Sequence, residues 1–217
     1  MTATAAVLDL RLDLNPEEVL RYLGYPQGRE ASAAARERLG ALWPVALALL
    51  APRGAYTLID REEAAAIGMP EPADRVGVAA CTIGPALEQT SERTAGAALL
   101  DAFVLDAIGS AAAEAAADAL NLELCSDAAS RGMEAAPRVS PGYGSWDTSC
   151  QTSLLALLPI EAIGIRLTSG AMMVPRKSLS FAAALVAPGG VAGHAASRCA
   201  RCGLVRCRHR MAPLPDG

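Results

Sequence analysis

The chain has 217 residues, which suits one large domain or one domain with a small appendage. Hydrophobic residues make up 52% of it and charged residues 19%, so it can bury a real core and is unlike an intrinsically disordered protein. The formal net charge of −4 provides no basic face for a phosphate backbone, which argues against a nucleic-acid partner.

Secretion and membrane insertion also lack support in the sequence. The N-terminal stretch MTATAAVLDLRLDL has neither the basic region nor the apolar run of a secretory signal. The apolar stretch Ala95–Leu120 contains Asp101 and Asp106, and an acid near a bilayer centre costs roughly 2.5–3.5 kcal/mol on insertion scales. We therefore expect a buried helix in a cytoplasmic protein with no membrane partner, whose six cysteines are thiols or metal ligands.

The first predicted elements are a strand and a short helix. Leucines alternate with other residues from Leu8 to Leu14, which is the pattern of a half-buried strand. The stretch NPEEVLRYLG then offers Asn15 as an N-cap, Pro16 at the first helical position and Gly24 as a stop. A strand followed at once by a capped helix is expected here.

Helices and short strands follow up to the long Ala-rich segment. A helix is predicted from about Glu30 toward Leu50, perturbed at Pro44 because proline lacks the N–H that a helix interior uses. AYTLID and RVGVAACTI are short β-type runs, and Gly84-Pro85 precedes another helix. The Ala-rich helix over Ala95–Leu120 comes next.

The second half is predicted to contain one more helix and two closing strands. An irregular polar connection over Cys125–Pro137 and the turn PGYG lead into a helix with Asp147 as its N-cap. GIRLT and SLSFAAALV are typical of strands, and the Gly-rich stretch APGGVAGHAAS follows them. We therefore divide the chain into a domain over residues 1–190 and a Gly-rich break with a Cys-rich tail over 191–217.

The order of these elements predicts the fold class. Strands and helices are mixed without a regular βαβ rhythm, which favours an α+β fold over a doubly wound one. We expect a mixed, largely antiparallel twisted sheet packed with helices, one long buried Ala-rich helix and a Cys-rich C-terminal tail.

Several common catalytic and nucleotide-binding motifs do not occur in the sequence. It has no G-x-G-x-x-G after a strand and no G-x-x-x-x-G-K-[ST]. Its two histidines, His194 and His209, both lie in the tail, which disfavours a Ser–His–Asp or Cys–His catalytic site. D-x-H-x-x-G, the stretch that ligates cobalt in corrinoid carriers, is also absent.

The stretch RVSPGYGSWDTSCQ combines an arginine with a Pro/Gly turn and two aromatic residues in a chain with only 4% aromatics. Arg138 can offer a guanidinium fork to a carboxylate, and Tyr143 offers a ring face and a hydroxyl. The turn between them lets a ligand approach the backbone, so a small zwitterionic ligand is one interpretation. A rigid turn whose tyrosine packs on the core is the other.

Acidic residues on the Ala-rich helix form a second candidate feature. Glu114 and Asp118 lie four residues apart and share a face, and Asp106 lies about two turns away on nearly the same stripe. These acids could line a cleft for an ammonium or sulfonium group, or they could form the solvated edge of a packed helix.

The tail contains a third candidate feature. Cys199, Cys202 and Cys207 have C-x2-C-x4-C spacing, and the first pair matches a metal knuckle. His209 or Cys150 could supply a fourth ligand. Zinc, an iron–sulfur cluster and free thiols are all left open.

Several stretches together resemble one family. GPALE, LDAIGSAAAEAAAD, RVSPGYGSWDTSCQTSLLALL, GIRLTSGAMMVPRKSLS and the terminal C-x2-C-x4-C-x2-R occur in this order. They resemble the activation domain of cobalamin-dependent methionine synthase in a free-standing form, from about Asp9 to the tail. The R-x-x-P-G-Y turn and the LT…M…P…S-x-S segment are the most specific parts of this resemblance.

In this family the R-x-x-P-G-Y turn holds S-adenosylmethionine. The resemblance implies that Arg138 pairs with the methionyl carboxylate, that the Ser140 backbone meets polar edges, and that Tyr143 contacts the ligand beside the cobalt-facing opening. The family also uses an acid near the start of the domain, for which RYLGY offers no clear counterpart. The S-adenosylmethionine-binding residues implied are Glu114, Arg138, Ser140, Pro141, Gly142 and Tyr143.

The resemblance also implies a function in methionine biosynthesis. The chain would act in trans as a component of a methyltransferase, supporting reductive methylation of Co(II) cobalamin carried by a separate methionine synthase. A flavodoxin- or ferredoxin-like protein would donate the electron. The alternatives are a reactivation or docking subunit for another corrinoid methyltransferase, and a non-catalytic regulatory protein with a metal-binding tail.

Overall fold

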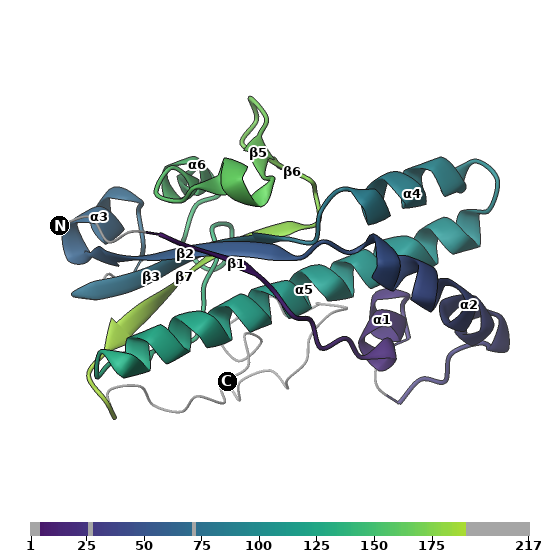
Figure 1. The fold of residues 1–217 in the computed structure, drawn as a ribbon, viewed down its shortest axis with the longest axis horizontal. Coiled ribbons are helices and arrows are strands. Elements are labelled where there is room, and N and C mark those ends of the chain that lie inside the picture. Colours follow the sequence, from purple (N-terminus) through teal and green to yellow (C-terminus); the bar gives the residue numbers. More distant parts are fainter. Residues whose placement is uncertain (1–4, 26–27, 71–72, 190–217) are drawn as a thin grey trace.

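The computed structural model describes residues 5–25, 28–70 and 73–189. The predicted α+β class is confirmed, because strands and helices are mixed along the chain (Figure 1). The elements are β1 Ala6–Asp9, α1 Pro16–Tyr22, α2 Ala33–Leu49, β2 Arg53–Asp60, α3 Arg61–Ala66, β3 Arg75–Thr82, α4 Ala86–Ala95, α5 Leu99–Ser130, β4 Glu134–Ala135, α6 Cys150–Leu155, the 3-10 helix η1 Ile160–Ile163, β5 Arg166–Leu167, β6 Met173–Val174 and β7 Ser178–Val186.

A five-stranded antiparallel sheet forms the centre of the molecule. Its strand order is β1-β2-β3-β7-β4, and the three longest strands, β2, β3 and β7, lie side by side. Figure 1 shows the sheet twisted, with α5 along one face and α6 and the β5–β6 hairpin over the other. The predicted antiparallel, twisted sheet is therefore confirmed.

The residues of β3 show why both faces of the sheet are covered. Alternate side chains of a strand point to opposite faces, and here both sets are apolar or small. Ala79 and Cys81 belong to the core under α5, while Val76, Val78 and Ala80 belong to the core under α6 and η1. A strand that is buried on both faces requires this continuous apolar sequence.

Helix α5 is longer than predicted and begins later. It spans 32 residues, and the irregular connection expected over Cys125–Pro137 is wrong because the helix continues to Ser130. Leu120, Leu124 and Ala128 are fully buried at i, i+4 and i+8, so one apolar stripe packs the extra turns onto the sheet. The prediction of a long buried Ala-rich helix is confirmed, with different ends.

The N-terminal helix matches its prediction and the strand before it does not. The Asn15 side chain accepts a hydrogen bond of 2.9 Å from the Glu17 backbone N–H, as an N-cap does. The strand predicted to reach Leu14 ends at Asp9, which pairs with Arg53 of β2. The next partner would be Pro52, which has no N–H to donate, so the ladder stops after the Leu10 N–H bonds its carbonyl at 2.9 Å.

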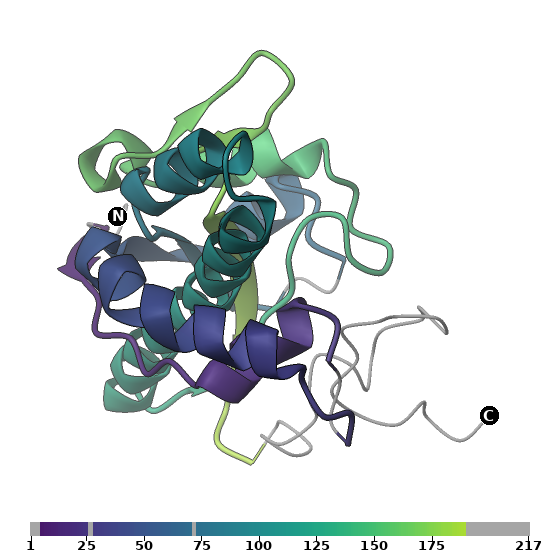
Figure 2. The ribbon, with the colours of Figure 1, turned by 90° about the vertical axis from the view of Figure 1, so that its right-hand side faces the viewer.

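The helix predicted from about Glu30 to Leu50 is α2. Its N-cap is Ser32, whose side chain accepts a bond of 3.2 Å from the Ala35 N–H. The helix continues through Pro44 rather than ending there. In Figure 2, which views the molecule from the end that carries α2, α4 and the start of α5, α2 packs across α5.

One of the two closing strands lies outside the main sheet. Within the segment GIRLT, Arg166–Leu167 forms β5, which pairs with β6 in a separate two-stranded sheet. In the main sheet, β7 pairs with β3 on one edge and with the short β4 on the other. The second closing strand, β7, is confirmed.

None of the helices within residues 5–25, 28–70 and 73–189 is both long enough and apolar enough to cross a bilayer. The proposed boundary near residue 190 and the tail after it lie outside the described residues.

Candidate functional site

The segment after β4 carries Arg138 along the edge of the sheet. Ala136 donates a backbone hydrogen bond of 2.8 Å to Ala184, and Val139 and Ala182 exchange two bonds of 2.8 Å. Adjacent residues of such a segment point to opposite faces. Val139 packs into the core under α6, which directs Arg138 to the face that α5 covers.

Arg138 lies between the sheet and α5, and its side chain is only 7% exposed. Its Nη2 donates to Glu114 Oε2 at 3.0 Å and to Asp118 Oδ1 at 2.6 Å. The guanidinium carbon lies 5.2 Å from the centroid of the Phe181 ring, within the range of a cation–π contact. A buried arginine requires such partners because burial of an unpaired charge is costly.

The acidic stripe of α5 is therefore divided between two cations. Glu114 and Asp118 do share a face, as predicted, and both contact Arg138. Asp106 instead pairs with Lys177 at 2.7 Å, and the same ammonium donates to Ser110 Oγ at 2.8 Å. The stripe does not act as one unit, since its ends have different partners.

The turn after Arg138 is closed by its own backbone. Tyr143 N–H donates to Ser140 carbonyl at 3.1 Å, and Gly142 N–H donates to Trp146 carbonyl at 2.7 Å. Gly142 has a φ of +92°, and a Cβ there would approach Thr148 Cγ2 to 2.8 Å, so glycine is required. The Ser140 carbonyl, expected to meet a ligand, thus already accepts one bond within the turn.

The two aromatic residues of the turn have different environments. Trp146 is 2% exposed, and its indole N–H donates to the Ile67 carbonyl at 3.1 Å. Tyr143 is 63% exposed. Trp146 therefore anchors the turn to the core, whereas the Tyr143 ring is open to contact from outside, contrary to a turn whose tyrosine packs on the core.

The helix after the turn begins later than predicted. Its first residue is Cys150, and its N-cap position is Ser149 rather than Asp147. The Asp147 carboxylate accepts a bond of 2.8 Å from the Ser149 backbone N–H, so it still caps the turn before the helix. Hydrogen bonds from the Ser149 side chain and backbone lower the pKa of Asp147.

A buried thiol lies close to the same site. Burial raises the pKa of Cys81 to about 12, and the positive charge of Arg138 opposes part of this rise. Cys81 is therefore a neutral core residue at neutral pH and not a nucleophile.

The structure does not test the predicted metal site. Cys199, Cys202, Cys207 and His209 lie outside the described residues. Cys150, the other ligand considered, is a partly buried free thiol. Within the described ranges, no group of three or more His, Cys, Asp or Glu side chains could hold a metal ion.

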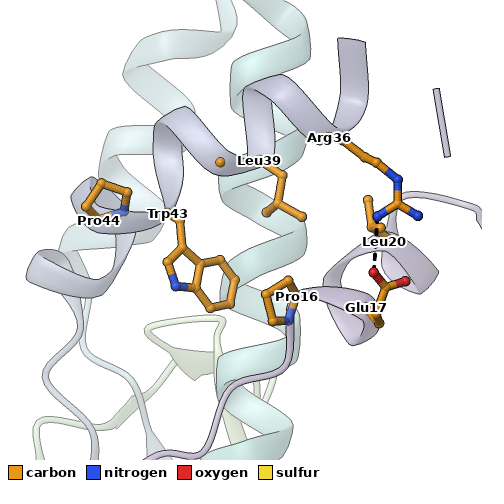
Figure 3. A pocket seen from close by; sticks show the side chains of 8 residues that line it. Pro16, Glu17, Leu20, Arg36, Leu39, Trp43 and Pro44 are labelled. Carbon is orange, nitrogen blue, oxygen red and sulfur yellow. Dashed lines mark hydrogen bonds and ion pairs between the residues drawn. The ribbon is translucent and has the colours of Figure 1, made fainter. Parts of the chain in front are cut away.

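A hollow of about 330 Å³ lies between α1 and α2, away from the residues described above (Figure 3). Trp43 and Leu39 of α2 point into it, and the ion pair between Arg36 and Glu17 (3.1 Å) lies at its side. None of the residues predicted to bind S-adenosylmethionine lines it. The α1–α2 hollow is therefore formed apart from the predicted binding residues, of which Arg138 is buried and Tyr143 is exposed.

Sequence reasoning did not foresee two contacts of Arg138: it gave no role to Phe181, and it considered Asp118 only as part of the acidic stripe. Phe181 and Asp118 were not among the predicted binding residues, yet both contact the Arg138 guanidinium. The i, i+4 spacing of Asp118 from Glu114 was the available signal for the acid. Phe181 gave none beyond its place in a strand.

The comparisons with known proteins add evidence on the fold. No protein-family model and no curated protein sequence matches the chain. A solved structure described as the MetH reactivation domain bound to AdoHcy is similar to it, with a TM-score of 0.60 and 16% identity. The match covers 88% of this chain and 81% of that chain, so the two share a fold over most of their length.

Proposed function

We propose that this chain binds S-adenosylmethionine and supports the reductive methylation of Co(II) cobalamin on a separate methionine synthase. The observation that carries the proposal is the shared fold with a reactivation domain that was solved with AdoHcy bound. AdoHcy is what S-adenosylmethionine becomes when it gives up its methyl group. The sequence resemblance in the R-x-x-P-G-Y turn supports the same conclusion independently of the fold.

The geometry of the candidate site is compatible with this role. Arg138 supplies a buried, fixed positive charge just before the turn, and Tyr143, five residues later in the chain, supplies an exposed ring. Glu114 lies within 3.0 Å of the same arginine and offers a negative group for the ligand ammonium. A methionyl ligand carries a carboxylate, which a positive group such as Arg138 can bind, and an ammonium, which a negative group such as Glu114 can bind.

The chemistry needs positioning more than acid–base groups. One electron reduces Co(II) to Co(I), and Co(I) then attacks the sulfonium methyl, giving methyl-Co(III) and the neutral thioether. The carbon–sulfur bond breaks as the carbon–cobalt bond forms, and no proton is transferred. The chain would contribute by holding the methyl donor in line with the metal. The cobalamin and the electron would come from partner proteins.

Calorimetric titration with S-adenosylmethionine tests the binding half of the proposal. The wild-type protein should bind, and Arg138→Ala should lower the affinity about tenfold to a hundredfold because a charge-assisted hydrogen bond is lost. Arg138→Lys should restore only part of the affinity, since lysine lacks the planar fork.

The matched control is Arg38→Ala. Arg38 pairs with Asp101 near the start of α5, so this variant also removes an arginine–aspartate pair from the same helix. Its affinity should equal that of the wild type. Thermal unfolding of all variants would show that the fold is intact. Equal affinities for Arg138→Ala and the wild type would remove this turn from the site.

A further inference from the structure

Both carboxylates that contact Arg138 use the same nitrogen. Glu114 and Asp118 each accept a hydrogen bond from Nη2, at 3.0 Å and 2.6 Å. A guanidinium has five N–H groups in a fixed plane, and Nη2 carries two of them. One of these points in the same direction as the Nε N–H and the other lies beside Nη1, so Nη2 belongs to both two-pronged edges of the group. Two acceptors on Nη2 thus occupy one prong of each edge.

This arrangement limits how a ligand carboxylate can bind. Two-pronged recognition of a carboxylate needs two neighbouring N–H groups that point the same way. Neither edge of Arg138 offers such a pair while both acids are bound. A ligand carboxylate that binds with two hydrogen bonds must therefore displace Glu114 or Asp118.

The two acids differ in how easily they can leave. The side chain of Asp118 is 62% exposed and that of Glu114 is 30% exposed. Water can solvate the more exposed carboxylate as it turns away, so its displacement is less unfavourable. Arg138 itself is held by Phe181 and by the backbone pairing of Val139 with Ala182, so a ligand carboxylate would displace an acid rather than move the arginine, and Asp118 is the more exposed of the two acids.

We propose that Asp118 stands in for the ligand carboxylate on Arg138 and competes with it, so that this residue sets the affinity of the site. The inference rests on the proposed function and deepens it. It gives the site a built-in limit on ligand affinity. A competing internal carboxylate would also keep the buried arginine paired whenever the ligand leaves.

The test compares Asp118→Asn with the wild type by titration with two ligands. For S-adenosylmethionine, the variant should bind about three- to tenfold more tightly, because a neutral amide competes less well for the guanidinium. For decarboxylated S-adenosylmethionine, the variant should bind no more tightly than the wild type, since that ligand has no carboxylate to gain.

Asp106→Asn is the matched control for the change in charge. It removes one negative charge from the same helix, about 18 Å along α5 from Asp118. In the wild type the Asp106 carboxylate pairs with Lys177. The affinity of this variant for both ligands should equal that of the wild type.

Each result of these titrations either supports or overturns the competition between Asp118 and the ligand carboxylate. Weaker or unchanged binding of S-adenosylmethionine by Asp118→Asn, with normal binding by the wild type, overturns the competition and leaves the proposed function standing. Equal tightening for both ligands also overturns it, because the effect would then be independent of the carboxylate. Failure of both proteins to bind S-adenosylmethionine would overturn the proposed function, and the competition with it.

Discussion

Tyr143 and Trp146 lie three residues apart in one turn and have opposite roles in the structure. The indole is buried and hydrogen-bonded to the Ile67 carbonyl, which ties the turn to the loop between α3 and β3. The tyrosine ring, 63% exposed, is available for contact with a ligand or a partner. A rigid base beneath an open aromatic ring is suited to holding a ligand in a defined direction.

Substitution of Tyr143 should therefore separate binding from methyl transfer. Tyr143→Ala should leave the free energy of unfolding within about 0.5 kcal/mol of the wild type, because the side chain is exposed. Under the proposed function it should slow methyl-Co(III) formation more than it weakens S-adenosylmethionine binding, because the ring would direct the donor toward the metal. Single-turnover spectra and calorimetry measure the two quantities. Tyr143→Phe keeps the ring and is the control; equal losses in rate and affinity would contradict an orienting role.

At the residue scale the sequence carried only local signals. The R-x-x-P-G-Y stretch predicts Arg138 and Tyr143 as binding residues, and their role stays a prediction; the structure buries the arginine and exposes the tyrosine. The acids that hold Arg138 are 20 and 24 residues away in the chain. Their contact depends on how α5 crosses the sheet, which no local pattern contains.

At the scale of the elements, the packing of α5 against the sheet depends on two glycines of the strands. A Cβ at Gly77 of β3 would lie 2.5 Å from Leu124, and one at Gly54 of β2 would lie 2.9 Å from Leu120. Both leucines are fully buried. The missing side chains leave room for the leucines of the helix, which brings α5 close to the strands.

Gly77→Ala should destabilise the protein by about 1–3 kcal/mol through overpacking. Rotation of Leu124 cannot fully relieve the clash, because its Cγ is also within 2.9 Å of the added methyl group. The matched control is Gly40→Ala at an exposed position of helix α2, where nothing lies within 4 Å of the new Cβ. It should stabilise the protein by about 0.5–1 kcal/mol, since alanine favours a helix. Urea unfolding measures both changes; equal effects at the two positions would show that α5 does not depend on this close approach.

At this scale the sequence predicted element types better than their ends and partners. Asn15 capped α1 as expected, because an N-cap is a local interaction. The end of α5 was missed because the polar residues near Cys125 concealed the stripe of Leu120, Leu124 and Ala128. The pairing of β5 with β6 was not predicted, because each strand has only two residues and so gives almost no alternating pattern.

For the whole molecule, the proposed function requires partners. The sequence lacks D-x-H-x-x-G, the stretch that ligates cobalt in corrinoid carriers. The similar solved structure is described as a reactivation domain, and this chain covers 81% of it. Under the proposed function, the cobalamin is held by another protein.

The decisive prediction concerns the mixture of all components. The chain, a Co(II) corrinoid protein, an electron donor and S-adenosylmethionine should together produce methyl-Co(III), followed in the visible spectrum of the corrinoid. Reduction to Co(I) is uphill alone, so methyl transfer from a donor held against the metal is needed to draw it forward. Omission of any one component should stop the reaction, and Arg138→Ala should slow it at subsaturating S-adenosylmethionine while Arg38→Ala should not.

If the cobalt stays Co(II) with methionine synthase although S-adenosylmethionine binds, reactivation is wrong for that partner. Methylation of a different corrinoid protein under the same conditions would then move the chain to that methyltransferase, whereas failure with every carrier would leave a ligand-binding protein without methyl chemistry.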